Sequence, residues 1–142
     1  MEIEAAITQL LLADTDLTDL IATRLYPQDA PQASELPLVL YVASSPEQMR
    51  GLKSYLDTHT LTLRFDCYGS REDGSYSSAK AVSKRIRHVL FSNERAKVGS
   101  DSIQLQGIFD GGGEDGLQEP LYSEEEGIDY VGVVVRLAYR TL

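Results

Sequence analysis

The sequence predicts an α+β fold, a mostly antiparallel sheet of four to six strands with two main helices packed on one face. Apolar residues recur every three or four positions in some segments, which is the helical period, and every second position in others, which is the strand period. The segments follow in the order helix, strand, strand, helix and then two or three strands, as in α+β domains. A chain of 142 residues with no linker composition is expected to be one domain, residues 1–142.

Two helical segments open the chain. In the first, glutamates lie near the positive end of the helix dipole, ahead of an apolar stripe. The stripe consists of Ile3, Ala6, Ile7, Leu10 and Leu11. The following segment, DTDLTDLIATRL, is expected to form a second short helix or turn that Thr15 or Asp16 caps.

A proline-rich ribbon separates these helices from the first strand. Pro27, Pro31 and Pro37 each fix φ and push the preceding residue away from the helical region, so no helix runs through this ribbon. We expect an extended surface segment that leads into the strand LPLVLYVAS. It serves either as a rigid crossing within one subunit or as an arm packed along a neighbouring subunit.

The next segment, SPEQMRGLKSYLDTH, is expected to be a polar connection. It nevertheless exposes apolar side chains, which are costly in water. These are Met49, Leu52, Tyr55 and Leu56. The loop over residues 45–58 either folds back as a small satellite core or docks on a partner, and Met49, Leu52 and Tyr55 are candidate contacts.

The segment HTLTLRFDCYGS alternates as a half-buried antiparallel strand does. Its apolar face holds Leu61, Leu63, Phe65 and Cys67. The single cysteine is therefore expected to be a buried structural residue and not a nucleophile. Arg64 and Asp66 lie on the opposite face, where a cross-strand structural ion pair explains them. Neither histidine has a motif partner and no metal-ligand spacing occurs, so we predict no enzyme, no metal and no cofactor.

The segment REDGSYSSAKAVSKRIRHVLFSN is the second clear helix. Its buried stripe is expected to contain Ala79, Val82, Ile86 and either Val89 or Leu90. A basic stripe on another face consists of Lys80, Lys84, Arg87 and His88. This stripe is either a solvated face or a contact with an acidic neighbour, such as the segment 110–126 of another copy, and a DNA contact ranks third. Opposite charges on two faces of one subunit are what a head-to-tail ring uses.

The last third of the chain is expected to contain two strands and an acidic connection. In DSIQLQGIFD, Ile103, Leu105, Gly107 and Phe109 are predicted to share one face, and IDYVGVVVRLAYRTL is a Val-rich strand. A short strand around residues 121–122 is a further expectation. The acidic candidates for subunit or partner contacts are Asp110, Glu114, Asp115, Glu124, Glu125 and Glu126. Glycines occupy the places where a calcium loop needs oxygen ligands, so a solvated hairpin loop is favoured.

The overall charge limits the class of partner. The formal net charge is −9, whereas a protein that grips DNA carries a basic face. No run of about 18 apolar residues is long enough to span a membrane. Acidic residues near the N-terminus do not fit a secretory signal, so we expect synthesis in the cytoplasm.

Several local signatures now converge on a known family. The helix ends in LIATRLYP, the ribbon PQDAPQASELP leads into LVLYVAS, the strand LTLRFDCYG leads into the helix SSAKAVSKRIRHVL, and LYSEEEG precedes the last strand. This pattern resembles the tail completion family of long-tailed phages, which is related to tail terminators and head–tail joining proteins. The resemblance covers nearly the whole chain.

The resemblance implies a structural role. Such proteins assemble as rings, usually hexamers, at the head-proximal end of the tail tube in the virion, after synthesis in the host bacterial cytoplasm. The implied partners are further copies of the chain, the tail tube protein and the head connector or neck protein. The copies can be monomers in isolation. DNA passes through the ring without being bound specifically, which an acidic channel favours. The alternatives are a head-completion or neck adaptor protein, and a soluble non-phage binding domain of similar fold.

Overall fold

The computed structural model describes residues 2–27, 36–44, 47–50, 55–69, 75–110, 121–123 and 128–142. Within these ranges it contains three helices, α1 (Ile3–Leu12), α2 (Thr15–Ile21) and α3 (Ser75–Ser92). The same ranges contain eight strands of one sheet, β1 (Leu25–Pro27), β2 (Leu38–Ala43), β3 (Glu47–Arg50), β4 (Tyr55–Tyr68), β5 (Lys97–Val98), β6 (Ile103–Asp110), β7 (Leu121–Ser123) and β8 (Ile128–Thr141). The predicted α+β class is confirmed.

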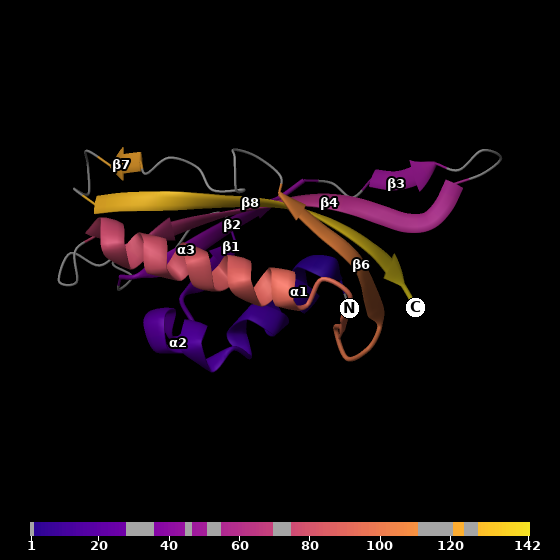
Figure 1. Ribbon diagram of the computed structural model, residues 1–142, viewed down its shortest axis with the longest axis horizontal. Helices are drawn as coiled ribbons and strands as arrows, with labels where there is room; N and C mark the ends of the chain where they lie inside the picture. The colour runs from indigo at the N-terminus through magenta and orange to yellow at the C-terminus, as the bar shows by residue number, and fades with distance from the viewer. Residues whose placement is uncertain are drawn as a thin grey trace.

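The two longest strands, β4 and β8, form the middle of the sheet. The strand order is β1-β2-β4-β8-β6-β5, with β3 paired to β4 and β7 paired to β8. Pairing is antiparallel throughout except between β1 and β2. The three helices lie together on one side of the sheet (Figure 1). We call the opposite side, which none of the described helices covers, the open face.

The hydrophobic core lies between the helices and the sheet. The sheet contributes every second residue of β4 and β8, because alternate side chains of a strand point to the same face. The core residues from β4 are Leu61, Leu63, Phe65 and Cys67, and those from β8 are Val133, Val135, Leu137 and Tyr139. The helices contribute the predicted stripes, among them Ile7 of α1 and Val82 and Ile86 of α3. The expectation that Cys67 is buried is confirmed, since its side chain is fully inaccessible.

The predicted cap of the second helix is wrong by one residue. The N-cap of α2 is Asp14, whose side chain accepts a hydrogen bond from the backbone N–H of Leu17 at 2.9 Å. Thr15 and Asp16 instead lie in the first turn of the helix. All three residue types cap helices well, and the carboxylate of Asp14 has a second partner that fixes its position, as described below.

The polar connection predicted before the half-buried strand contains strands of its own. Residues 47–50 form β3, and β4 begins at Tyr55, so the two strands pair as a hairpin. The register places Arg50 opposite Tyr55 and Glu47 opposite Thr60. β8 joins β4 only from Thr58 onward, so the tip of this hairpin extends past the end of β8.

The alternation predicted for β6 is wrong after Leu105. The register of β6 against β8 shifts between Leu105 and Gly107, which is a β-bulge. Beyond the bulge, Ile108 is buried, whereas Phe109 is 58% exposed on the open face. A single extra residue exchanges the two faces of a strand because the side-chain period is two.

The proline-rich ribbon begins as an edge strand. Leu25–Pro27 pairs in parallel with β2, and the guanidinium of Arg24 donates a hydrogen bond from Nε to the carbonyl oxygen of Pro37 at 2.8 Å. These contacts hold the two ends of the ribbon side by side. Residues 28–35 lie outside the described part of the chain.

Candidate assembly surfaces

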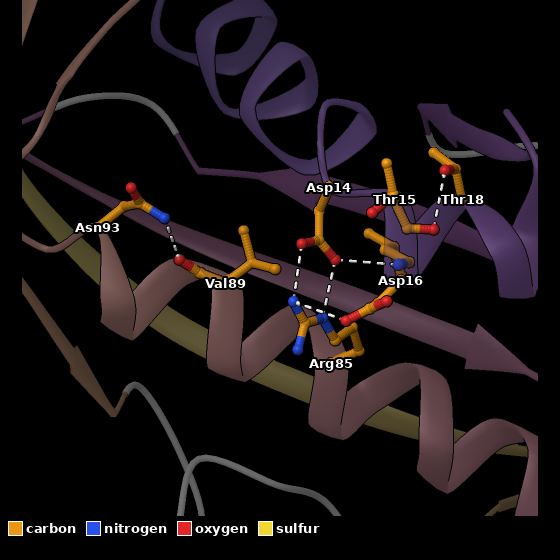
Figure 2. Close-up of polar contacts among 8 residues, drawn as sticks. Asp14, Thr15, Asp16, Thr18, Arg85, Val89 and Asn93 are labelled. Atoms are coloured by element: carbon orange, nitrogen blue, oxygen red, sulfur yellow. Dashed lines mark hydrogen bonds and ion pairs between the residues drawn. The ribbon is translucent and has the colours of Figure 1, made fainter.

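An ion pair joins α2 to α3 at the side of the molecule away from the sheet. Arg85 of α3 donates two hydrogen bonds to the carboxylate of Asp14, both at 2.8 Å, and its Nη2 lies 3.4 Å from Asp16 (Figure 2). These hydrogen bonds from Arg85, and the N–H of Leu17, lower the pKa of the Asp14 carboxyl. The pairing of Arg85 could not be predicted from the sequence, because a basic residue on a helix has many possible acidic partners.

The predicted basic stripe lies on α3, but its members have different surroundings. Lys80 lies over the ring of Tyr76, 5.6 Å from its centroid, and Arg87 lies 4.6 Å from the centroid of Phe91. These distances suit cation–π contacts. Lys84 and His88 are the exposed members of the stripe. The role of the stripe as a contact surface stays a prediction.

The second predicted contact region is the β3–β4 hairpin. The backbone places Met49 within β3 and Tyr55 at the start of β4, whereas Leu52 lies outside the described residues. A two-stranded hairpin is at best marginally stable in water. The docking of this loop on a partner, like the alternative that it folds back as a small satellite core, stays a prediction.

The third predicted region is the acidic connection between β6 and β8. Asp110 ends β6, and Glu114, Asp115, Glu124, Glu125 and Glu126 lie outside the described residues. Residues 110–129 contain eight acidic residues and no lysine or arginine. Removing these eight negative charges from the net charge of −9 leaves −1 for the other 122 residues. The acidity of the protein is therefore concentrated in one segment.

The open face carries polar and aromatic side chains from β4 and β8. Arg64 donates from Nε to Asp66 at 2.8 Å, so this ion pair forms along one strand, not across two strands as predicted. The rings of Tyr68 and Tyr130, which are opposite each other in the register, stack at 4.8 Å between centroids. Such pairs stabilise neighbouring strands by up to about 1 kcal/mol.

Cations and one aromatic ring also project from the open face. Arg136 and Arg140 are exposed and alternate along β8 with the buried Val135, Leu137 and Tyr139. In β5, Lys97 is exposed and its neighbour Val98 is buried, so Lys97 is also on the open face. We call Lys97, Arg136 and Arg140 the open-face cations. None of them forms an ion pair with a residue that the structure describes.

The ring of Phe109 lies beside one of these cations, Arg136. It is opposite Arg136 in the register of β6 and β8. It also covers Gly107, where an added Cβ atom would come within 2.8 Å of the ring. The glycine thus leaves room for an aromatic ring that lies along the strand and stays largely exposed.

The structure describes the surroundings of the one thiol and of the potential metal ligands. Burial strongly raises the pKa of the Cys67 thiol, so the thiolate that would be reactive is suppressed. Within the ranges given above, no three His, Cys, Asp or Glu side chains lie close enough together to hold a metal ion. A search of the same ranges for a helix capable of crossing a membrane found none.

Comparison with known families identifies the chain. Residues 5–107 match the model of the tail completion protein gp17 family. The chain belongs to this tail completion family. The matched residues run from α1 to the β-bulge of β6, so they include most of α1, all of α2 and α3, and the ribbon between α2 and β2.

Two solved structures share the fold of this tail completion protein. One chain from the virion of a native gene transfer agent particle is 16% identical, with a TM-score of 0.70, and the match covers 97% of this chain and 94% of that chain. The gp17 protein of bacteriophage SPP1 is 13% identical, with a TM-score of 0.54, and the match covers 98% of this chain and 87% of that chain. None of the curated proteins compared with the chain matches it.

The family match ends three residues before the acidic segment begins. Gly107 is the last matched residue, so the segment 110–129 and the whole of β8 lie beyond the match. The similarity of fold nevertheless extends over nearly the whole tail completion protein.

Proposed function

We propose that this chain is a structural subunit of a ring at the head-proximal end of a phage or prophage tail tube. The ring ends polymerisation of the tube and joins the tail to the head. The observation that carries this proposal is the match of residues 5–107 to the tail completion family. The likeness of fold to a chain of a gene transfer agent virion supports it.

The distribution of charge supports assembly into a ring. A ring of identical subunits needs a heterologous contact, in which one surface of a subunit meets a different surface of the next. The acidic segment 110–129 and the cationic surfaces of the rest of the chain supply two surfaces of opposite sign. Complementary charge of this kind orients subunits and accelerates their encounter.

The proposed partners follow from the same role. Six copies form the ring, the tail tube protein meets one side of it, and the head connector or neck protein meets the other. The basic stripe of α3 and the β3–β4 hairpin are the predicted contacts with a neighbouring copy or with these partners. DNA passes through the ring without specific binding, because an acidic channel repels phosphate.

The first experiment measures the mass of the purified chain by light scattering after gel filtration, across a concentration series at low and high salt. We expect a mass near six subunits that falls as salt rises, because screening weakens contacts between charged surfaces. The tail tube protein of the same phage is then polymerised with and without the chain, and tube lengths are measured by electron microscopy. We expect shorter tubes that carry the ring at one end.

Two results together would overturn the proposal. The first is that the chain stays monomeric at every concentration, both with and without tubes. The second is that the length of the tubes does not change when the chain is added. That combination would favour the independent binding domain. A monomer that nevertheless assembles on tube ends would support the proposal, because association must repay its entropy cost and the tube can supply the missing contacts.

A further inference from the structure

The helical layer carries no excess of positive charge that could pair with the acidic segment. Residues 2–24 and 75–95, which include the three helices, contain six acidic and six basic residues. Arg85 is already paired with Asp14 and Asp16, and Lys80 and Arg87 lie over aromatic rings. The helical side of the molecule is therefore close to neutral, and many of its basic side chains already contact acidic or aromatic residues of the same chain.

The open face, in contrast, has an excess of basic over acidic residues among its described side chains. Among its described side chains, the only acidic one is Asp66, which is paired with Arg64. The open-face cations extend across neighbouring strands, because Lys97 is opposite Gln104 and Gln104 is opposite Arg140. Phe109 adds an exposed ring beside Arg136. Cations around an exposed aromatic ring suit an acidic peptide that also carries apolar side chains.

The densest part of the acidic segment cannot reach these cations within one chain. Glu124, Glu125 and Glu126 belong to the four-residue connection between Ser123 and Ile128. Arg136 and Arg140 lie eight and twelve residues along β8 from Ile128, which is about 26 Å and about 40 Å at ~3.3 Å per residue. Four fully extended residues span at most about 14 Å. The two ends of β8 therefore carry opposite charge and are held apart by the strand itself.

We propose that the open-face cations, together with Phe109, bind the Glu124–Glu126 run of a second copy of this chain. The contact is heterologous, since the acidic end of β8 in one copy meets the cationic end of β8 in the next, and it repeats head to tail. This inference rests on the proposed ring and names the surface through which its subunits meet.

The test exchanges the charges of the two surfaces. Variant R136E/R140E and variant E124K/E125K/E126K should each lose assembly, measured as mass by light scattering, because like charges then face each other. A chain that carries both sets of substitutions should assemble again, since the opposite charges are restored. Variant A5E/Q9E, which adds two negative charges at exposed positions of α1 outside every proposed contact, is the control on the helical side, and its mass should equal that of the unchanged chain. All four substituted positions on the described surfaces are exposed, so circular dichroism should show native folding.

A second measurement separates this inference from the proposed function. A fluorescein-labelled peptide of residues 119–129 is titrated with the full chain, and its anisotropy gives the affinity at low salt. Exposed ion pairs contribute up to about 1 kcal/mol each, so R136E/R140E should weaken binding about tenfold or more, whereas A5E/Q9E should leave it unchanged. A peptide with the three glutamates replaced by glutamine should also bind more weakly than the original peptide, because it lacks the negative charges that pair with Arg136 and Arg140.

The possible outcomes are distinct. If the unchanged chain forms a ring but the charge exchanges do not alter its mass and the peptide does not bind, the inference is overturned and the proposed function stands. If the chain neither forms a ring nor acts on tubes, yet the peptide binds through Arg136 and Arg140, the surface is supported and the proposed function fails. Binding that K84E/H88E abolishes, and R136E/R140E does not, would assign the acidic run to α3 and overturn the inference.

Discussion

The carboxylate of Asp14 holds two helices at once, because it accepts the N–H of Leu17 at the start of α2 and two hydrogen bonds from Arg85 of α3. Replacing Asp14 with alanine removes both functions of the side chain. Loss of an N-cap costs about 1 kcal/mol, so we expect D14A to lower the free energy of unfolding by at least that amount in urea titrations. D19A, at an exposed position of the same helix, is the control and should change stability far less. Equal effects of the two substitutions would contradict this account.

The Asp14–Arg85 pair also predicts a pH dependence of stability. The pKa of Asp14 is lower in the folded chain than the ordinary value of 3.8 for this carboxyl group. The stabilisation by the charged carboxylate is therefore complete above that value and is lost as the pH falls through the lower pKa of the folded state. D14N keeps a capping side chain and removes the charge. The difference in unfolding free energy between the unchanged chain and D14N should shrink between pH 6 and pH 3. A difference that stays constant would show that the charge contributes nothing.

The β-bulge in β6 predicts opposite effects at two adjacent apolar residues. Ile108 is 3% exposed and Phe109 is 58% exposed. Truncation of a buried isoleucine costs about 2–5 kcal/mol, so I108A should be strongly destabilising, whereas F109A should change stability by less than about 1 kcal/mol. Thermal and urea unfolding of the two variants check this. The reverse order would mean that the strand alternates without a bulge.

Burial of Cys67 predicts an unreactive thiol. The side chain is fully inaccessible and its pKa is raised, so both access and thiolate formation are suppressed. Ellman's reagent should not react with the native chain and should react with one thiol per chain in urea. S77C, which adds a thiol at an exposed position of α3, should react at once in the native state. Rapid native reaction of Cys67 itself would contradict its placement in the core.

The sequence contained enough information for the class of fold and the composition of the core. The stripes of α1 and α3 and the alternation of β4 follow directly from hydrophobic period, and the core contains the predicted residues, such as Val82 and Phe65. Segment order and local signatures also led to the family. These are properties that neighbouring residues along the chain share, so one sequence is sufficient to detect them.

Features that depend on contacts between residues far apart in the sequence were not predicted. Asp14, Thr15 and Asp16 are all good caps, and only Arg85, which lies 71 residues from Asp14, distinguishes the first from the others. The β-bulge leaves the apolar character of Ile108 and Phe109 unchanged and alters only which of them faces the helices. The open-face cations belong to β5 and β8, and only the pairing of both with β6 brings them onto one surface.

The position of β8 has a consequence for synthesis of the protein. β8 pairs with β4 on one edge and with β6 and β7 on the other, yet the ribosome makes it after the other seven strands. Until it emerges, β4 and β6 have no common neighbour and the nascent chain presents unpaired strand edges. We therefore expect folding of the sheet to be delayed until translation of this segment is finished.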